Sequence, residues 1–267
     1  MKTTKFGEFI ESKNKIRPKV NLIIPSYNEV KRIGDVADSL INLLKSQEIG
    51  VDLSLIFVDD GSTDNTAELI ANRLNQKSLN ASLIKLDKNR GVGCAFLRAL
   101  DFSNSDLVCL FPADGVFDIN SLIVFLNSSQ CDCITLSTRT NRYLANATRR
   151  YCSKLFGRWF SWLTNSYVPD PHSLFLIPTF TAKSVVKELW GDLPLQKEFR
   201  LENDYHVLFL HDVLMKKPVA NLVEVRINSK FENNSTAWNF PFVARFCRIC
   251  IRMTLTKFKF FRKTIKA

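Results

Sequence analysis

Short apolar runs alternate along the chain with longer segments whose apolar residues recur every three or four positions. The apolar runs have the length of buried β-strands and lie at residues 20–25, 51–58, 81–86, 107–111 and 131–136. The segments with helical periodicity are residues 30–46, 63–76, 91–102 and 119–128. Strands this apolar are usually covered by helices on both faces. The pattern therefore predicts an α/β fold with an open, mostly parallel sheet and helices on both faces.

Polar residues suited to binding follow the predicted strands directly. In a sheet of this kind, ligands bind beyond the carboxyl ends of the strands. The second strand ends in Asp59 and Asp60, which repel each other unless a hydrogen-bond donor or a cation lies between them. A base edge, a ribose diol or a metal ion would satisfy both carboxylates. Gly61 permits the sharp turn that follows, and we expect Ser62 or Asp64 to cap the next helix.

Two later strand ends offer candidates for binding phosphate and metal. Gly91 and Gly93 open the helix after the third strand, where they either cradle a phosphate or serve a tight turn and close helix packing. Asp114 follows the fourth strand and is a candidate ligand for a divalent cation that would neutralise a diphosphate. The sequence contains no GxxxxGK[ST] phosphate-binding loop.

The positive charge of the chain is concentrated in two segments. The 267 residues include 37 Lys and Arg against 26 Asp and Glu, a net charge of +11. Residues 139–169 hold six basic and no acidic residues, and residues 239–267 hold eight basic and no acidic residues. A protein that coats nucleic acid more often spreads Lys and Arg over a whole face. The hydrophobic content of 46% excludes a disordered polyelectrolyte.

Cysteine usage and the termini narrow the class further. The seven Cys are an odd number, lie mostly in apolar runs and form no paired CxxC clusters, which favours buried, reduced thiols in a cytosolic protein. Residues 1–19 form a charged N-terminal extension without the apolar centre of a secretory signal. No window approaches the roughly 18 uninterrupted apolar residues that span a bilayer. Any contact with a membrane is therefore expected from the side.

The strand-end motifs form a series along the chain. IPSYNE ends the first strand, VDDGSTDNT the second, NRGVG follows the third, and an Asp-containing turn follows the fourth. Later segments are LSTR at 136–139, RRYCS at 149–153, VPDPHS at 168–173, Glu202, VEV at 223–225 and NST at 234–236. The first series resembles glycosyltransferase family 2 with its GT-A fold, and the later segments resemble the polyprenyl-phosphate branch, whose best-known members make dolichyl-phosphate mannose. The resemblance implies a GT-A domain over residues 20–238, with a nucleotide-sugar half at 20–138 and an acceptor half at 139–238.

The resemblance also implies roles for individual residues. The residues expected to bind the nucleotide sugar are Pro25, Tyr27, Glu29, Asp59, Asp60 and Gly91. Asp114 is expected to bind Mg²⁺ or Mn²⁺ at the diphosphate. The residues expected to bind the acceptor phosphate or the leaving diphosphate are Arg139, Arg149, Arg150, Ser153, Lys230 and Ser235. Arginine suits this task because its guanidinium is always charged and binds two phosphate oxygens at once.

The chain departs from the family pattern at several positions. The family's DxD motif reads Pro112-Ala113-Asp114, so the first carboxylate is missing and Asp118 is the nearest candidate to replace it. The family's DxxSGFR turn reads DPHSLFL here, without the Gly and the Arg, and its EVP strand reads EVR. Because the latter changes fall on the acceptor half, the nucleotide-sugar half is better supported.

The implied reaction is inverting transfer of a sugar from a nucleoside diphosphate sugar. Asp114 with its metal, helped by Arg139, would balance the charge that develops on the diphosphate. A polyprenyl phosphate acceptor is already an anionic nucleophile. A hydroxyl acceptor, as in polysaccharide or lipopolysaccharide synthesis, needs a base, for which the candidates are Asp170, Glu202 and Asp204. Both acceptor classes stay open.

Residues 239–267 predict a basic amphipathic helix that begins near Asn239, with Pro241 in its first turn. Its basic residues recur at spacings of three, four and seven, beside an apolar stripe formed by Phe242, Phe246, Ile249, Met253 and Phe260. Such a helix lies in the interface of an anionic leaflet, or it packs on the domain with a solvated charged face. We expect the first, and with it a peripheral protein on the cytoplasmic face of a membrane.

Functions from other classes remain. A sugar-1-phosphate nucleotidyltransferase would need a Gly-rich basic loop directly after the first strand, where Ser26-Tyr27-Asn28-Glu29 stands instead. A nucleic-acid-binding protein is suggested by the charge, but the basic segments flank an acidic nucleotide-sugar half. A catalytically inactive, nucleotide-binding family member is suggested by Pro112. The expected partners are a nucleoside diphosphate sugar, a lipid phosphate or glycan acceptor and an anionic membrane surface, and not nucleic acid.

Overall fold

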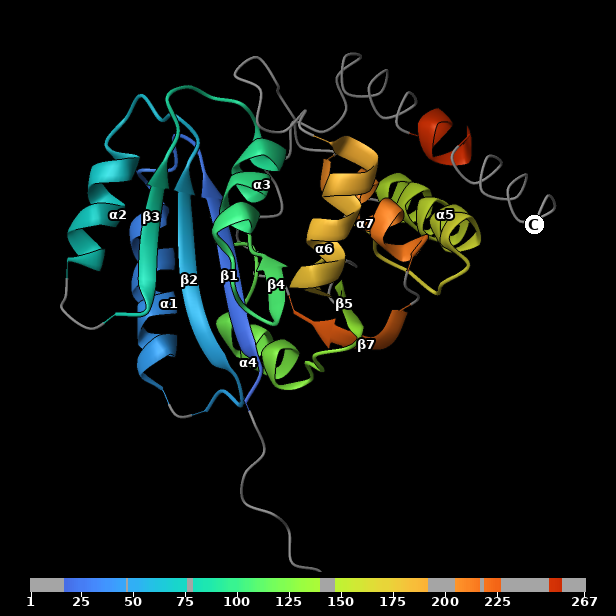
Figure 1. Ribbon diagram of the computed structural model, residues 1–267, viewed down its shortest axis with the longest axis horizontal. Coiled ribbons are helices and arrows are strands. Elements are labelled where there is room, and N and C mark those ends of the chain that lie inside the picture. The colour runs from blue at the N-terminus through green and yellow to red at the C-terminus, as the bar shows by residue number, and fades with distance from the viewer. Residues whose placement is uncertain are drawn as a thin grey trace, which may run out of the picture.

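One seven-stranded sheet organises the molecule (Figure 1). The computed structural model describes residues 17–46, 48–75, 79–139, 147–191, 205–216, 219–226 and 250–255. The strands are β1 (Lys19–Ser26), β2 (Asp52–Asp59), β3 (Ala81–Lys85), β4 (Leu107–Leu110), β5 (Ile134–Arg139), β6 (Phe175–Pro178) and β7 (Val219–Val225). The helices are α1 (Ile33–Lys45), α2 (Thr66–Leu74), α3 (Val92–Phe102), α4 (Ile119–Asn127), α5 (Ala147–Thr164), α6 (Thr179–Val185), which continues into the π-helical turn η2 (Val186–Trp190), and α7 (Tyr205–Leu214). Residues 250–255 are also helical.

The sheet is mostly parallel, as predicted. The strand order is β3-β2-β1-β4-β6-β5-β7, and β6 alone among these strands runs antiparallel to its neighbours. Because β1, β2, β3 and β4 are parallel, their carboxyl ends meet at one edge of the sheet (Figure 1). This edge therefore gathers the loops that carry the sequence motifs.

Two apolar cores cover the two faces of the sheet. Successive side chains of a strand point to opposite faces, and in β1 Ile23 belongs to one core while Leu22 and Ile24 belong to the other. Helices α3, α5, α6 and α7 supply the core around Ile23, and α1, α2 and α4 supply the opposite one. Burial on both faces explains why these strands are continuously apolar. The predicted fold class is confirmed.

The main differences from the predicted elements lie in the second half of the sheet. The strand predicted at residues 131–136 begins at Ile134, because residues 131–133 form a turn in which the N–H of Cys133 donates to the carbonyl of Gln130. Strand β6 was not predicted, since its four residues directly follow a motif interpreted as a turn. The predicted division at residue 138 falls within β5, and the division into a nucleotide-sugar half and an acceptor half stays a prediction.

The described part of the C-terminal region packs on the domain. Met253 is fully buried in the core around Ile23, whereas Ile251 and Leu255 are exposed. The prediction that Met253 belongs to a lipid-facing stripe is therefore wrong, because its side chain fills a gap in the protein core. Asn239, Pro241 and the remaining residues of that stripe lie outside the described residues. Within the described residues, no helix has the length and apolar character needed to cross a bilayer.

The six described cysteines are free thiols, and only some of them are buried. Cys94 and Cys109 lie in the cores, whereas Cys131 is exposed. The expectation of buried thiols is thus wrong for Cys131, because it lies in the turn before β5 rather than in the strand.

Candidate active site

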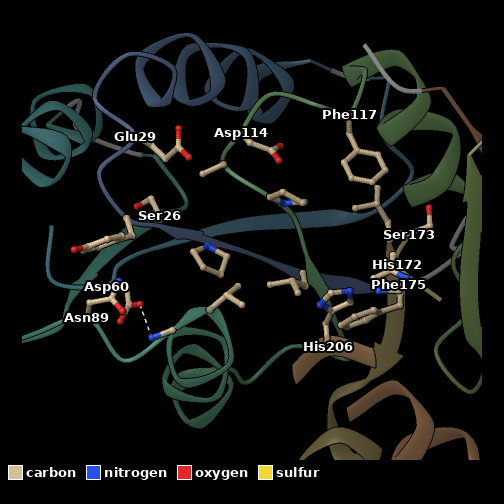
Figure 2. A pocket seen from close by; sticks show the side chains of 18 residues that line it. Ser26, Glu29, Asp60, Asn89, Asp114, Phe117, His172, Ser173, Phe175 and His206 are labelled. Atoms are coloured by element: carbon tan, nitrogen blue, oxygen red, sulfur yellow. Dashed lines mark hydrogen bonds between the residues drawn. The ribbon is translucent and has the colours of Figure 1, made fainter. Parts of the chain in front are cut away.

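A cleft of about 630 Å³ opens at the carboxyl ends of the parallel strands (Figure 2). Its walls come from the loops after β1, β2, β3 and β4, from the turn before β6 and from the start of α7. The residues that line it are Pro25, Ser26, Tyr27, Glu29, Asp60, Asn89, Gly91, Val92, Leu110, Pro112, Ala113, Asp114, Phe117, His172, Ser173, Leu174, Phe175 and His206. The predicted residues that it brings together are Pro25, Tyr27, Glu29, Asp60, Gly91 and Asp114.

The loop after β2 holds the loop after β1 in place through its polar side chains. Three successive backbone N–H groups donate to it, those of Asn28 to Ser62 Oγ (3.0 Å), Glu29 to Thr66 Oγ1 (2.9 Å) and Val30 to Asp64 Oδ2 (3.3 Å). In return, Asn28 Oδ1 accepts from the N–H of Thr63 at 2.9 Å. Asn28 has φ of 54°, a left-handed conformation that Asn tolerates better than most residues. The polar motif after β2 therefore positions the first loop, including Glu29.

Of the two predicted helix caps, Asp64 bonds the start of α2 and Ser62 bonds the first loop. The N-cap position of α2 is Asn65, which makes no side-chain capping bond. Asp64 Oδ1 accepts from the N–H of Thr66, the first residue of α2, at 3.0 Å, while its Oδ2 bonds the first loop. Gly61 does make the predicted turn, with φ of 69°. A Cβ at Gly61 would also collide with the backbone of Lys88, so this glycine serves both the turn and a close approach of two loops.

Asp60 binds the loop between β3 and α3. Its carboxylate accepts from the N–H of Arg90 at 2.8 Å. It also accepts from the N–H of Gly91 at 2.7 Å, the bond dashed in Figure 2. Backbone donors thus satisfy Asp60 without a ligand. Gly91 has φ of 90°, which requires glycine, and its N–H is used by Asp60. Both observations favour the tight-turn interpretation of Gly91 over a phosphate cradle.

Asp59 is placed differently from its neighbour. Its Oδ2 accepts from the N–H of Ser62 at 3.3 Å, while its Oδ1 is buried and has no hydrogen-bond partner among the described residues. Asp59 does not line the cleft. Its predicted contact with the nucleoside stays a prediction.

Asp114 and Glu29 lie on the same side of the cleft (Figure 2). Burial raises the pKa of the Asp114 carboxyl above its usual value. The hydrogen bond from the N–H of Val116 and the positive charges of Arg32 and Arg139 lower this pKa, but burial has the larger effect. Burial also raises the pKa of Glu29, and the charge of Asp114 raises it further while Arg32 lowers it. Two partly desolvated carboxylates that affect each other would be stabilised by a cation.

The residues present suit a divalent cation only in combination with a ligand. No three His, Cys, Asp or Glu side chains cluster to hold a metal in the described part of the chain. Mg²⁺ commonly uses one or two carboxylates together with substrate phosphates and water, and Asp114 with Glu29 fits that donor set. Asp118 is not such a ligand in this arrangement, because it lies outside the cleft wall and caps α4 by accepting from the N–H of Ser121 at 3.0 Å.

Arg139 and Asp170 bind each other beside the cleft. The guanidinium donates Nε to Asp170 Oδ2 at 2.7 Å and Nη2 to Oδ1 at 2.9 Å, and the side chain of Asp170 is only 1% exposed. Neither residue lines the cleft, but the charge of Arg139 lowers the pKa of Asp114. Asp170 thus orients Arg139, and the catalytic roles predicted for both stay predictions.

A glycine of α5 sets the position of Asp170. A Cβ at Gly157 would collide with the carbonyl oxygen of Pro169, so the chain before Asp170 lies directly against the helix. This close packing brings the turn at residues 170–173 to the cleft.

Of the other predicted acceptor residues, the structure describes the side chains of Arg150 and Ser153, and neither lines the cleft. Arg150 is exposed on α5, and Ser153 is partly buried there. Arg149 belongs to the same helix, but its side chain lies outside the described residues. Glu202, Asp204, Lys230 and Ser235 lie wholly outside them.

Sequence reasoning assigned no role to several residues of the cleft. Ser26 and Asn89 lie on the side of the cleft that carries Asp60, and Phe117, His172 and His206 line the other parts (Figure 2). His172 lies in the DPHS segment at residues 170–173. The departure of this segment from the family's DxxSGFR turn was the sequence signal that could have identified it. No local pattern marks His206, which reaches the cleft only because α7 begins beside β6.

An open sheet with one reversed strand and carboxylates at its carboxyl edge defines a nucleotide-sugar transferase of the GT-A type. The chain belongs to glycosyl transferase family 2, whose family model matches residues 21–190. The recognition made from the motifs is thereby confirmed.

The similarity to curated relatives covers only part of this chain and only part of each relative. A dolichyl-phosphate beta-glucosyltransferase of Dictyostelium discoideum is 34% identical over 115 residues, which are 41% of this chain and 35% of that protein. An undecaprenyl-phosphate 4-deoxy-4-formamido-L-arabinose transferase of Proteus mirabilis is 32% identical over 96 residues, 36% of this chain and 29% of that protein. The chain thus spans about a third of the length of the curated relatives it matches.

Solved structures share the fold at low identity. Glucosyl-3-phosphoglycerate synthase from Mycobacterium tuberculosis, in complex with Mn²⁺, UDP and glucosyl-3-phosphoglycerate, has a TM-score of 0.56 at 17% identity and covers 90% of this chain and 80% of its own. A mannosyltransferase from Pyrobaculum calidifontis, in complex with GDP-Man and Mn²⁺, has a TM-score of 0.55 at 15% identity and covers 84% of this chain and 60% of its own. At these identities the likeness establishes the GT-A fold.

Proposed function

We propose that this protein transfers a sugar, with inversion, from a nucleoside diphosphate sugar to a polyprenyl phosphate. The observation that carries the proposal is the cleft at the carboxyl edge of the sheet, in which Asp114 and Glu29 face a common space. The relatives named for dolichyl-phosphate and undecaprenyl-phosphate transfer support the acceptor class. Hydroxyl-acceptor transfer is the alternative.

We assign the nucleoside to the end of the cleft at which Asp60 and Asn89 lie (Figure 2). Tyr27 also lines the cleft. Tyr27 is 42% exposed and presents an aromatic ring suited to packing against a base. Pro25 lines the same wall, and Asp60 keeps the loop of Asn89 and Gly91 in position through backbone N–H groups. We therefore assign binding to Tyr27 and Asn89 and a positioning role to Asp60.

The diphosphate is expected beside Asp114 and Glu29. Mg²⁺ or Mn²⁺ bound there would supply positive charge to the leaving diphosphate. Arg139 adds a cation whose charge acts on Asp114 and whose orientation is set by Asp170. Pro112 contributes no oxygen ligand, and Glu29 from the first loop is the second carboxylate on this side of the cleft.

The reaction with a phosphate acceptor needs no general base. An oxygen of the acceptor phosphate bonds to the anomeric carbon from the face opposite the leaving group. The bond from that carbon to the donor diphosphate breaks, and the nucleoside diphosphate leaves with the electron pair. A hydroxyl acceptor would need a carboxylate base, and both oxygens of Asp170 are already bound by Arg139. The other two candidate bases, Glu202 and Asp204, lie outside the described residues.

The outer face of α5 supports the proposal that the protein lies on the cytoplasmic face of an anionic membrane. Tyr151, Leu155 and Trp162 are 65%, 45% and 55% exposed on this helix. The same face carries the exposed basic residues Arg150, Lys154 and Arg158. The helical residues 250–255 lie on the same side of the molecule as α5 in Figure 1, and Ile251 and Leu255 of that segment are exposed. Exposed aromatic and basic residues together suit a headgroup interface, where the acceptor lipid would reside.

The direct test uses the purified full chain and a screen of UDP- and GDP-sugars, with release of nucleoside diphosphate as the readout. Reactions are run with and without polyprenyl phosphate, and with Mn²⁺ or EDTA. We expect release that needs both polyprenyl phosphate and metal, and loss of at least a hundredfold in Asp114→Asn. Nucleotide-sugar binding without release under any condition would identify a catalytically inactive member and overturn the proposal.

A further inference from the structure

The cleft wall is poor in positive charge for a site that receives phosphates. Its lining residues include the carboxylates of Glu29, Asp60 and Asp114, and no Lys or Arg among the residues that the structure describes. His172 and His206 are the only lining side chains in that set that can carry a positive charge. This contrast directs attention to the two imidazoles.

The two histidines come from different parts of the chain and meet in the cleft. His172 lies in the turn before β6, and His206 lies in the first turn of α7. Their ring centroids are 5.2 Å apart with an interplanar angle of 73°, an edge-to-face pair. The ring of His172 also packs on Phe156 of α5, with centroids 5.5 Å apart. Packing from three segments therefore fixes where both rings lie.

The pair stands at the end of the cleft opposite the nucleoside end. Figure 2 shows His172 and His206 side by side near Phe175, away from Asp60 and Asn89, with Asp114 on the wall between the two ends. A donor whose base lies near Asn89 and whose diphosphate lies at Asp114 would point its sugar toward the histidines. The atom that attacks the sugar then enters from their side.

Imidazole chemistry suits a phosphate monoester in this position. Each ring carries at least one N–H donor in either protonation state, and a phosphate has several acceptor oxygens that two such donors can bind together. Two protonated imidazoles side by side repel each other unless an anion lies between them, so an anionic ligand would stabilise the pair. A hydroxyl group carries no charge and has a single acceptor oxygen.

We propose that His172 and His206 together bind the phosphate group of the acceptor. This inference rests on the proposed function and assigns that site a specificity for a phosphorylated acceptor over a hydroxyl acceptor. The phosphate can belong to a lipid or to a soluble compound, and the shared chemistry is the phosphate monoester.

The chain allows a direct binding test because it has only three histidines. His211 is fully buried on α7 with Nδ1 2.9 Å from Asp212 Oδ1, so it serves as an internal reference. The full chain is labelled with ¹⁵N-histidine, and imidazole signals are followed by NMR during titration with farnesyl phosphate, farnesol, inorganic phosphate and UDP.

We expect farnesyl phosphate to shift the signals of His172 and His206 and to leave His211 unchanged, while farnesol shifts neither. Tighter binding of farnesyl phosphate than of inorganic phosphate would identify a lipid phosphate, and equal binding would identify a soluble phosphorylated acceptor. Equal shifts with farnesol, shifts with UDP alone, or no shift with any phosphate would overturn the inference.

Kinetics with His172→Gln and His206→Gln gives a second readout. We expect the KM for polyprenyl phosphate to rise about tenfold in each variant, as loss of about 1.4 kcal/mol of binding implies, with the KM for the donor unchanged. The matched control is Lys187→Gln on η2, an exposed side chain outside the cleft wall. A raised donor KM with an unchanged acceptor KM would overturn the assignment.

Failure of this inference and failure of the proposed function are distinguishable. If the histidine variants and the original protein bind nucleotide sugar equally but farnesyl phosphate shifts no imidazole, only the inference fails. If no nucleotide sugar binds, the proposed function fails, and the phosphate titration still decides whether the histidine pair binds phosphate. Thermal unfolding of each variant checks that the fold is retained.

Discussion

The guanidinium of Arg139 binds both carboxylate oxygens of Asp170, a residue 31 positions later in the chain. The pair joins the end of β5 to the turn before β6, and Asp170 is almost completely buried. A carboxylate engaged in this way holds an arginine in one orientation. The ion pair therefore supports an orienting role for Asp170, and the general-base role that its place in the sequence suggested stays a prediction.

Asp170→Asn should destabilise the protein and misplace Arg139. Removing one partner of a buried ion pair costs about 3–5 kcal/mol, because the other charge is left buried without compensation. We expect the free energy of unfolding, measured by urea denaturation, to fall by about 3 kcal/mol. The double variant Arg139→Gln/Asp170→Asn is the control and should recover part of that loss. A stable Asp170→Asn variant that had lost activity together with the acidic limb of its pH–rate profile would indicate a general base instead.

Asp60→Asn should be more damaging than Asp59→Asn, although the two residues are adjacent. Asp60 accepts two backbone N–H groups, and an amide nitrogen in place of one oxygen would face a donor. An unsatisfied buried group costs about 1–3 kcal/mol. Asp59 Oδ1 has no partner among the described residues, so Asp59→Asn removes less. We expect the Tm of thermal unfolding and the affinity for nucleotide sugar to fall clearly in Asp60→Asn and slightly in Asp59→Asn. The reverse order would contradict the assigned contacts.

Gly157→Ala should destabilise the protein, against the usual effect of this substitution in a helix. Alanine is favoured over glycine in helices by about 1 kcal/mol, but here its Cβ would collide with the Pro169 carbonyl oxygen. Overpacking costs about 1–3 kcal/mol and would move the turn that carries Asp170 and His172. Gly50→Ala is the control, since its Cβ would make an ordinary contact with Asn127 Oδ1 at 3.4 Å. A Gly157→Ala variant with raised thermal stability would show that the close approach is absent.

Asp114→Asn should stabilise the metal-free protein at neutral pH and abolish its response to Mn²⁺. Burial raises the pKa of Asp114, so the unfolded chain releases this proton at lower pH than the folded one. Stability therefore falls as pH rises from the ordinary Asp pKa through the raised value, and the neutral amide removes that loss. We expect a higher Tm than the original protein at pH 7 without metal, and no gain on adding Mn²⁺. A Mn²⁺-induced rise in Tm equal to that of the original protein would remove Asp114 from the metal site.

The outer face of α5 should control membrane binding. Each Lys or Arg near an anionic surface contributes about 1 kcal/mol to membrane binding. Replacing Arg150, Lys154 and Arg158 by Gln should therefore lower the binding constant for anionic liposomes, measured by co-sedimentation, by about a hundredfold. Trp162→Ser should weaken it further because the exposed ring no longer enters the interface. Phe102→Ser is the control, as Phe102 is 66% exposed on α3. Unchanged binding of the charge variants would place the membrane contact elsewhere.

Much of the fold follows from local sequence patterns. Continuous apolar runs predicted the strands because a parallel sheet buries both of its faces, and β1, β2 and β4 lie close to their expected positions. Strand β6 was not predicted because its four residues carry no periodicity of their own. Its reversed direction is decided by pairing with β4 and β5, which are distant in the chain.

The candidate site divides in the same way. The strand-end motifs identified Tyr27, Glu29 and Asp114 as residues of the cleft, since the carboxyl ends of parallel strands converge on one edge. The motif after β2 was assigned to helix capping, and Asp64 does bond the start of α2, but Ser62 and Asp64 also bond the first loop. The local sequence identified the polar groups of the site but not the groups that they contact.

The sequence by itself determined the class of fold, the edge of the sheet at which the cleft lies and the family. Apolar periodicity and strand-end motifs express these properties over a few neighbouring residues. Only the tertiary structure decided which groups meet: Asp60 with the Gly91 N–H, Arg139 with Asp170, and His172 with His206. The physical reason is that hydrogen bonds, ion pairs and ring contacts depend on distances of a few ångströms between segments far apart in the chain. Those distances are set by the packing of the whole sheet and its helices.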